Sequence, residues 1–320
     1  MHKWSFWNKS AVTEFILVGI PTNQNFQSFL FFIFITAYLL TVTGNIVIIT
    51  LIRADSHLHR PMYFFLSNFA FMQICYITVT VPTLLSGFLT STNKISIGAC
   101  FTQCYFFFLL GGIENFLLAI MAYDRYVAIC HPLRYNAIVT SKVCWRLACG
   151  CWFGIFLGSL LPVIFLARLS FCGPNVINHY FCDISPLLKL SCSDTSLLKS
   201  YFFSLMWVIV FSCLLFTLLS YISIITAIFK IPSTAGRQKV FSTCGSHLTV
   251  VIIYFGAVIF MYVRPREGYS FEEDKLISVF YSILTPLLNP FIYCLRNKEI
   301  KQALKKCIQS KKSLLPHVHM

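Results

Sequence analysis

The sequence predicts an all-α membrane protein: a seven-transmembrane helix bundle with a short C-terminal amphipathic helix. Composition is the first observation, since 57% of the 320 residues are hydrophobic and 11% are charged, whereas a soluble domain is about 45–50% apolar and about 25% charged. The second is that the apolar residues form long runs with few charges, each able to supply the roughly 20 residues that cross a bilayer. Short basic or polar segments separate the runs, which therefore form one transmembrane domain.

Basic residues mark the membrane boundaries of these runs. Arg53 follows the first run, and Arg60 precedes the second. Lys142 precedes the fourth, while Lys230 and Lys239 enclose the connection between the fifth and the sixth. We therefore expect seven membrane-spanning helices, in chain order at residues 27–52, 61–86, 98–129, 143–167, 198–229, 240–263 and 276–295.

A short amphipathic segment follows the seventh span, at residues 298–306. Its apolar residues recur at helical spacing with lysines between them, as Ile300, Ala303, Leu304 and Cys307. This pattern is typical of a helix that lies on a membrane surface. Membrane lipid is therefore an expected partner.

The distribution of charge predicts the orientation. One set of connections, together with the C-terminal tail, carries most of the 25 Lys and Arg residues. The positive-inside rule places this side in the cytosol, which makes the N-terminus extracellular. The expected division is an extracellular segment at 1–26, the membrane domain at 27–295, and a cytoplasmic helix and tail at 296–320. Since topology explains the net charge of +14, nucleic acid is not an expected partner.

Two features suit the predicted extracellular side. The tripeptide Asn8-Lys9-Ser10 is a glycosylation acceptor in the N-terminal segment. Most of the 14 cysteines lie inside spans, where cysteine is usually a small apolar residue. Oxidising surroundings favour two disulfides among the remaining outer cysteines, and the sequence allows three pairings of Cys100, Cys172, Cys182 and Cys192.

An acid and an arginine, Asp124 and Arg125, stand at the cytosolic end of the third apolar run. Charged side chains inside a membrane are costly and usually functional. A neighbouring acid can hold an arginine through a charge-assisted hydrogen bond, which predicts a switch. The alternative is an arginine that extends to lipid phosphates.

Five motifs make the chain similar to the rhodopsin-like G-protein-coupled receptors, and specifically to their olfactory receptor branch. They are PMYFFLSN (61–68), MAYDRYVAICHPLRY (121–135), SY (220–221), KVFSTCGSHLTVV (239–251) and PLLNPFIYCLRN (286–297). Each lies at the membrane edge that the topology assigns to it, and the resemblance covers nearly the whole chain.

The resemblance implies an odorant receptor of the plasma membrane. Its expected partners are a small volatile ligand and a heterotrimeric G protein of the stimulatory, olfactory type, which raises cyclic AMP. It implies no cofactor and no enzyme, and the sequence shows no metal-protease helix, nucleophile elbow or phosphate loop. The alternatives are a receptor for a non-volatile metabolite outside the nose, and a transporter, against which the lack of an internal repeat argues.

The resemblance also assigns residues to G-protein coupling and activation. It implies that Arg125 turns from Asp124 toward Tyr221 and the terminal helix of the G protein when an agonist binds. Pro290 removes a backbone hydrogen bond and kinks its helix, which makes a hinge there. The implied set is Asp124, Arg125, Tyr126, Tyr221, Asn289, Pro290 and Tyr293.

The segment 179–183, with the sequence HYFCD, resembles a stretch proposed as a metal site in this family. The resemblance pairs Cys182 with Cys100, and Cys172 with Cys192. A disulfide removes the Cys182 thiolate, and a tight metal site needs three or more free ligands. No metal site is therefore expected.

Glu114 is the acid that we expect deepest inside a span, about 15 Å from Asp124 along the helix. The family usually pairs this glutamate with an acid in the second span, where this chain has Gln73. Two alternatives follow. One is a cation site that rests on a single carboxylate, and the other is a protonated Glu114 hydrogen-bonded to Gln73.

A ligand pocket is expected between the third, fifth, sixth and seventh spans, toward the extracellular side. Helical spacing gathers uncharged candidates on one face of each span. Such an apolar cavity suits a small neutral volatile better than an amine, and the alternative role of the same residues is bundle packing. The candidates are Cys104, Phe107, Phe108, Gly111, Gly112, Leu205, Met206, Ile209, Phe255, Val258, Ile259, Tyr262 and Ser282.

One departure from the family lies beside this pocket. The family usually carries Phe-Tyr-Gly in the sixth span, whereas this chain has Tyr254-Phe255-Gly256. The hydroxyl therefore moves about 100° around the helix, and any polar switch at this place is altered.

Overall fold

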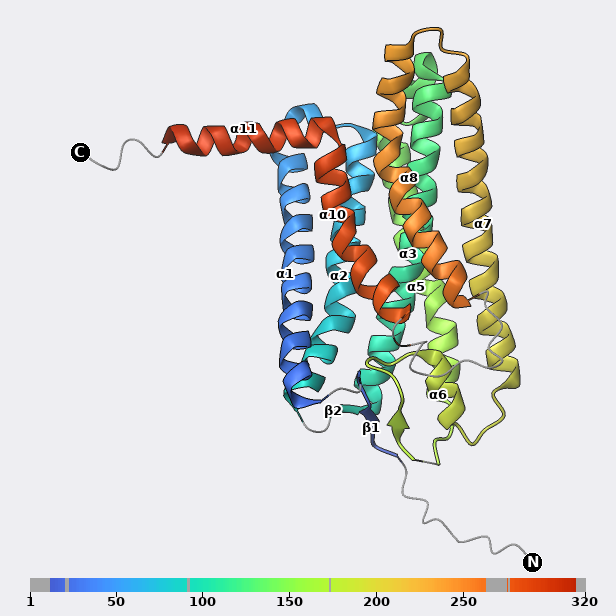
Figure 1. Ribbon diagram of the computed structural model, residues 1–320. Coiled ribbons are helices and arrows are strands. Elements are labelled where there is room, and N and C mark those ends of the chain that lie inside the picture. Colours follow the sequence, from blue (N-terminus) through green and yellow to red (C-terminus); the bar gives the residue numbers. More distant parts are fainter. Residues whose placement is uncertain are drawn as a thin grey trace, which may run out of the picture.

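Long helices run side by side in the computed structural model (Figure 1), which describes residues 12–20, 23–90, 93–172, 174–262, 275 and 277–314. Six helices are long and apolar enough to cross a membrane, and α8 adds the shorter apolar stretch Cys244–Phe260. The predicted helical membrane bundle is confirmed, and the predicted spans fall on α1 (Gln24–Ala54), α2 (Pro61–Leu89), α3 (Ile97–Cys130), α5 (Ser141–Ala167), α7 (Ser196–Phe229), α8 (Thr234–Tyr262) and α10 (Thr285–Arg296).

Local sequence sets several of the helix starts. Asn23 caps α1 by accepting a hydrogen bond from the amide of Phe26 at 3.0 Å. Ser96 and Thr140 cap α3 and α5 in the same way. Pro61 begins α2, where its missing N–H has no intrahelical partner to lose.

Helix α3 lies at the centre of the bundle. It contacts α2, α5, α7 and α8, while α1 packs against α2 and α10. The outer faces of the other helices expose large hydrophobic side chains, among them Phe32, Phe153 and Ile222. Exposed apolar surface of this extent is suited to lipid.

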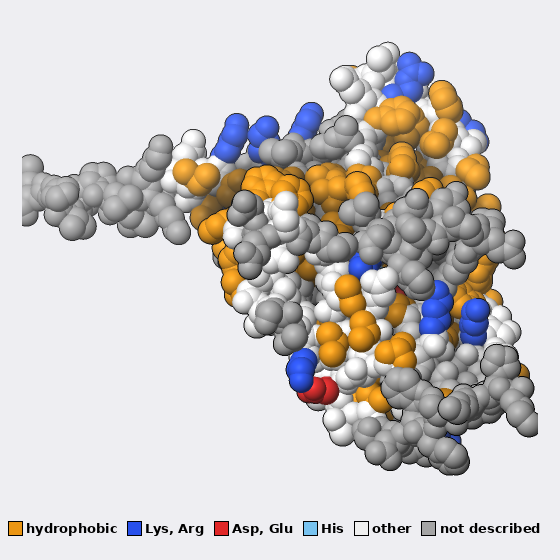
Figure 2. Space-filling view, turned by 60° about the horizontal axis from the view of Figure 1, so that its bottom comes forward, with side chains coloured by type: hydrophobic (Ala, Val, Ile, Leu, Met, Phe, Trp, Pro, Cys, Tyr) orange, Lys and Arg blue, Asp and Glu red, His pale blue; other side chains and the backbone are white. Residues whose placement is uncertain are grey.

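Helix α11 (Lys298–Leu314) leaves the bundle sideways above α1 (Figure 1). It continues beyond the predicted end at residue 306. Ile300 and Ala303 are buried against the bundle, whereas Lys301 and Lys305 are exposed. Figure 2 shows basic side chains of this helix on one side of it, next to a band of hydrophobic side chains. This arrangement is that of an interfacial helix.

The seventh span contains a π-helical turn, η3 (Phe280–Leu284), before α10. The span predicted at 276–295 gives no sign of this turn. Pro286 follows at the start of α10 and has no N–H with which to continue an α-helical ladder. The hydroxyl of Thr285 instead donates to the carbonyl of Phe280 at 3.1 Å. Such turns often lie at functional sites.

A small sheet at the end opposite α11 was also unexpected. Strand β1 (Glu14–Leu17) lies between β2 (Asn93–Ser96), to which it is antiparallel, and β3 (Val176–Ile177), to which it is parallel. The short helix α6 (Ile184–Leu190) belongs to the same end. The N-terminal segment is thus joined to two connections between helices at this end.

Short turns shape the connections at the other end. They are η1 (Ser56–Leu58) between α1 and α2, and η2 (Pro132–Arg134) with α4 (Tyr135–Ile138) between α3 and α5. Helix α8 begins at Thr234, six residues before the predicted span. Its first turns are too polar for a hydropathy criterion but remain helical, and Figure 1 shows α7 and α8 continuing past the level of α11.

Candidate ligand-binding and signalling sites

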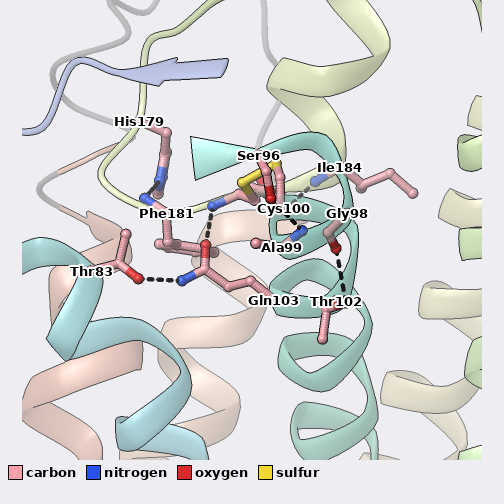
Figure 3. Close-up of a disulfide and its surroundings, with 12 residues drawn as sticks. Thr83, Ser96, Gly98, Ala99, Cys100, Thr102, Gln103, His179, Phe181 and Ile184 are labelled. Atoms are coloured by element: carbon pink, nitrogen blue, oxygen red, sulfur yellow. Dashed lines mark hydrogen bonds between the residues drawn. A yellow bond between two sulfur atoms is a disulfide. The ribbon is translucent and has the colours of Figure 1, made fainter. Parts of the chain in front are cut away.

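A disulfide fixes the connection 168–195, at the end of the bundle opposite α11, onto α3. Cys100, in the first turns of α3, is bonded to Cys182, and Cys172 is bonded to Cys192. These are the two pairs that the family resemblance implies. Next to the first pair, the side-chain oxygen of Gln103 accepts from the amide of Cys182 at 2.9 Å (Figure 3).

Gln103 also joins this connection to α2. Its Nε2 donates to the carbonyl of Val79 and to the hydroxyl of Thr83, both at 2.8 Å. Because the side-chain amide of Gln103 bonds both to α2 and to the disulfide-bonded segment, it fixes the position of the Cys182 backbone relative to α2 and α3. Sequence reasoning missed Gln103, since a glutamine within a span carries no sign of its partners.

Tyr180 extends from the same connection to the seventh span. Its hydroxyl lies 2.7 Å from the hydroxyl of Ser282 and accepts from the hydroxyl of Ser278 at 3.1 Å. All three side chains are buried. Ser282 was predicted to face the pocket, and the structure shows that its hydroxyl is engaged by Tyr180. The segment of Tyr180 and Phe181 thus forms a lid over the bundle.

His179 and Asp183 flank this lid without converging on a metal. The ring of His179 accepts from the amide of Phe181, and Asp183 caps α6. Burial, and then the ammonium of Lys275, lower the pKa of His179 to about 3, so its imidazole is neutral at physiological pH. In the described ranges, no group of three or more His, Cys, Asp and Glu side chains could hold a metal ion.

Aromatic rings pack together below the lid. Phe107 of α3 lies with its ring centroid 4.6 Å from that of Phe181. Phe108, the next residue, meets Phe202 of α7 at 4.7 Å. Phe202 was not predicted, although its spacing from Met206 and Ile209 placed it on their face of the helix. The wall below the lid is therefore aromatic and apolar.

The other predicted pocket residues divide by depth. Cys104, Phe255 and Val258 are buried, whereas Leu205, Met206, Ile209 and Ile259 are partly exposed. The side chain of Tyr262 lies outside the described residues, as does Asn8, the predicted glycosylation site.

Two adjacent glycines of α3 have different surroundings. A Cβ atom placed on Gly111 would meet nothing within 4 Å, whereas one on Gly112 would lie 2.7 Å from Cγ2 of Ile155 in α5. Gly111 therefore faces open space. Gly112 permits the close approach of α3 and α5, so the structure places it at a contact between these helices, and its role in a pocket stays a prediction. Helical spacing alone had placed Gly111 and Gly112 on one broad face of α3. Neighbouring helix positions point about 100° apart, so the two glycines meet different surroundings.

The hydroxyl of Tyr254 links α8 to α3. It accepts from the side-chain amide of Asn115 at 2.8 Å and donates to the carbonyl of Gly111 at 3.2 Å. Asn115 also donates to that carbonyl. Because tyrosine stands at 254 and phenylalanine at 255 in this chain, the hydroxyl has a hydrogen-bond partner on α3. Phe255 packs within the hydrophobic core.

Replacing Tyr254 by Phe should lower the free energy of unfolding by about 1–2 kcal/mol, because two hydrogen bonds between α3 and α8 are lost, one buried and one partly buried. The measurement is the thermal unfolding of purified receptor. Asn115→Ala and the double variant complete a mutant cycle, in which the second substitution should cost less once the first is present. Equal unfolding of Tyr254→Phe and the natural chain would contradict the assigned contact.

Glu114 and Gln73 meet in the centre of the bundle. Nε2 of Gln73 donates to Oε1 of Glu114 at 2.6 Å, and both side chains are buried. Oε1 of Gln73, and on α10 the side-chain nitrogen of Asn289, have no hydrogen-bond partner among the described residues. The contact is compatible with both alternatives, since either form of the carboxyl can accept from the amide.

Gln73→Asp should make basal cyclic AMP sensitive to sodium. The amide is a neutral ligand, and a second carboxylate would add the charge that compensates a cation for its lost hydration. We expect the variant to lose basal signal as sodium rises, and the natural chain to respond little. The measurement is basal cyclic AMP in membranes across a sodium series at constant ionic strength. An equal response of the two proteins would refute the role of the missing charge.

Asp124 and Arg125 do not face each other. The Asp124 carboxylate accepts from the hydroxyl of Tyr135 at 2.7 Å, and in the part of the chain that the structure describes the ion pairs are Arg60 with Glu299 and Lys94 with Glu14. The direct pair suggested by the sequence is thus not formed here. Consecutive helical residues diverge, so Asp124 turns to α4 while Arg125 turns into the bundle.

Arg125 is 3% exposed and lies in electrostatic range of Tyr221, His247 and Tyr293. Tyr221 and His247 share a hydrogen bond of 2.7 Å between α7 and α8. The structure thus gathers three of the predicted coupling residues. His247 was missed, although it lies in the fourth motif. Tyr126 packs against the cluster that contains Tyr221, and its hydroxyl lies 3.2 Å from the ring of His131.

A cavity of about 280 Å³ opens beside this group. Its lining includes Asp124, Arg125, Ala128 and Tyr135 from one side and Glu299 from the other. It lies where α3 meets α2 and α11, at the end of the bundle that carries most of the basic connections. A partner inserted here would contact both members of the Asp-Arg motif.

The predicted hinge packs closely against α1. Pro290 lies inside α10, with Asn289 and Tyr293 buried on either side. A Cβ atom on Gly44 of α1 would lie 2.8 Å from Cβ of Pro290. The ring of Tyr293 faces that of Phe69 on α2, with 6.1 Å between centroids. The kinked segment is therefore held by α1 and α2.

Comparison with known proteins gives one consistent result. Residues 34–311 match the family profile described as olfactory receptor. The chain is 53% identical to "Olfactory receptor 6B1" of Homo sapiens over 93% of this chain and 96% of that protein. It is 51% identical to "Olfactory receptor 226" of Rattus norvegicus, with 94% and 93% covered, and 48% identical to human "Olfactory receptor 6Y1", with 96% and 94% covered.

Proposed function

The chain belongs to the olfactory receptor family, and we propose that small, neutral, apolar volatiles bind below its extracellular lid and switch it to a state that activates a stimulatory G protein of the olfactory type. Membership of the family makes it a multi-pass odorant receptor and not an enzyme. The proposal adds the class of ligand, the pathway through cyclic AMP, and the orientation with the N-terminus outside.

The observation that carries the choice of ligand is the wall formed by Phe107, Phe108 and Phe202 next to the open space at Gly111. The predicted pocket residues include no acid that could pair with an amine. The hydroxyls of Ser282 and Tyr180 already bond to each other. Small-molecule sites of this kind are mainly apolar with few polar anchors, which favours a ligand without charge.

The cytosolic proposal rests on charge and geometry. Arg125 is buried beside Tyr221 and His247, and the cavity next to it opens on the side of α11. The same side carries the greater share of Lys and Arg, as cytosolic loops do. An agonist that favours one arrangement of this group would shift the equilibrium by its differential affinity for the two states.

A panel of volatiles tests the proposal. Neutral alcohols, esters, aldehydes and hydrocarbons are applied to cells that express the chain, beside amines and carboxylic acids of matched size, and cyclic AMP is recorded. We expect responses within the neutral set. Activation by amines alone would overturn the ligand class, and responses that appear as calcium release without cyclic AMP would overturn the G-protein class.

Gly111→Val should raise the agonist concentration for half-maximal response at least about tenfold, because the side chain fills open space that the ligand uses. A loss of about 1.4 kcal/mol of binding corresponds to that factor. Surface expression should stay near that of the natural chain, since a Cβ atom at Gly111 meets nothing within 4 Å. The measurement is a dose–response curve at matched surface level.

The neighbouring Gly112→Ala is the matched control. Its methyl group would clash with the stiff, β-branched Ile155, and overpacking of this kind costs about 1–3 kcal/mol. It should lower surface expression and leave the agonist concentration for half-maximal response unchanged, and Ile155→Ala should restore expression. An unchanged dose–response curve for Gly111→Val would remove Gly111 from the pocket.

A further inference from the structure

A second cavity, of about 670 Å³, opens between the cytosolic ends of α1 and α2 and the start of α5. It lies apart from the ligand pocket and from the cavity at Arg125, with which it shares Arg60. The size is within the range of sites that hold small molecules, about 300–1,000 Å³. The signalling proposal makes no use of it.

Three basic side chains stand at this cavity. Arg53 ends α1, and His59 and Arg60 precede α2. Arg60 forms an ion pair with Glu299 of α11, with 3.3 Å between its guanidinium nitrogen and the carboxylate oxygen. Arg53 forms no ion pair in the ranges that the structure describes. No acid is among the residues that line the cavity. The cavity therefore presents net positive charge to whatever enters it.

The rest of the wall is apolar and continues toward the bilayer. Phe64 of α2 and Trp145 of α5 pack edge to face, with 5.0 Å between ring centroids. Trp145 and Phe71 are 61% and 52% exposed, although both lie on membrane-spanning helices. The cavity thus joins a basic end to a surface that faces lipid.

We propose that this cavity binds an anionic phospholipid of the cytosolic leaflet. The phosphate group would lie against Arg53, with His59 and Arg60 beside it, and one acyl chain would follow Phe64, Phe71 and Trp145. Basic pockets between membrane helices suit anionic head groups. A zwitterionic lipid would bind more weakly, because the positive charge of its own head group is repelled by the arginine. The assignment rests on the orientation proposed above.

Tryptophan quenching tests the site directly. The full chain is placed in nanodiscs of phosphatidylcholine that contain rising fractions of phosphatidylserine with brominated acyl chains. The difference in quenching between the natural chain and Trp145→Phe is the signal of the tryptophan at the cavity. Both leaflets have the same composition, so the result does not depend on orientation or on signalling.

Arg53→Gln should raise the phosphatidylserine fraction for half-quenching about fivefold, the factor that corresponds to about 1 kcal/mol per basic side chain near an anionic surface. Arg53→Lys keeps the charge and should stay within about twofold of the natural chain. Lys230→Gln, a charge change at the end of α7, should leave the value unchanged. Thermal unfolding of each variant shows whether it is folded.

Three outcomes would overturn the proposal. Brominated phosphatidylcholine could quench Trp145 as well as the serine lipid does, which would make the site an unselective apolar surface. Lys230→Gln could shift the curve as much as Arg53→Gln, which would make the effect one of general surface charge. Soluble glycerophosphoserine could relieve the quenching at low concentration, which would make the ligand a free phosphate.

Discussion

Arg125→Ala is expected to reduce agonist-driven cyclic AMP to the unstimulated level while the protein still reaches the cell surface. Arg125 is buried next to the bonded pair Tyr221 and His247, at the edge of the cavity proposed to receive the G protein. A buried arginine offers charge-assisted hydrogen bonds to a partner's carbonyl groups. An alanine would leave that contact unmade, so binding of agonist would no longer be transmitted.

The experiment compares cyclic AMP at equal surface expression, measured on intact cells. Tyr123→Phe is a suitable control, because the ring of Tyr123 lies near Phe216 of α7 and does not line the cavity, and this variant should retain most of the signal. Arg125→Lys should recover only part of the response, since an ammonium lacks the planar fork of the guanidinium. Full signalling by Arg125→Ala would refute the assigned role.

Cys100→Ser or Cys182→Ser is expected to abolish surface expression. The bond closes a long loop, with a sequence separation of 82 between the cysteines, and loss of a native disulfide costs about 2–5 kcal/mol in small extracellular domains. Here it would also free the backbone that Gln103 holds, and with it the lid at Tyr180. The measurement is antibody binding to an extracellular tag on intact cells.

The second disulfide gives a graded comparison. Cys172 and Cys192 are only 20 residues apart, and Cys192 lies in an exposed turn, so Cys172→Ser should reduce expression less. The double variant of Cys100 and Cys182 should behave like either single one, because each single change already breaks the bond. Peptide mapping that finds Cys100 as a free thiol in mature protein would exclude the pairing.

The positions and the order of the membrane helices follow from the sequence. A run of apolar residues that crosses a bilayer must satisfy its backbone within itself, so hydropathy alone located the spans and the amphipathic α11. The motifs identified the family for the same reason: MAYDRYVAIC and PLLNPFIY place polar residues at membrane depths where few sequences tolerate them. A hydrogen bond between Glu114 and Gln73 was one of the two alternatives that the sequence left open, since both residues lie deep in adjacent spans.

Contacts between distant segments could not be read in this way. The sheet that joins Glu14–Leu17 to two later connections has no pattern of its own, because strands this short gain their stability from pairing. The π turn at Phe280–Leu284 depends on how Pro286 ends the local hydrogen bonding. Gln103, Phe202 and His247 became recognisable as site residues only when their partners on other elements were known.

The sequence by itself determined the class of the molecule, the order of its membrane helices and its family, because each depends on local composition and on motifs within one segment. Only the tertiary structure decided the direction of individual side chains. It turned Asp124 to Tyr135 and Arg125 into the bundle, and it separated Gly111, beside open space, from Gly112 against Ile155. Each helical residue advances about 100° around the axis, so adjacent residues meet different neighbours, and the packing of the other helices decides which.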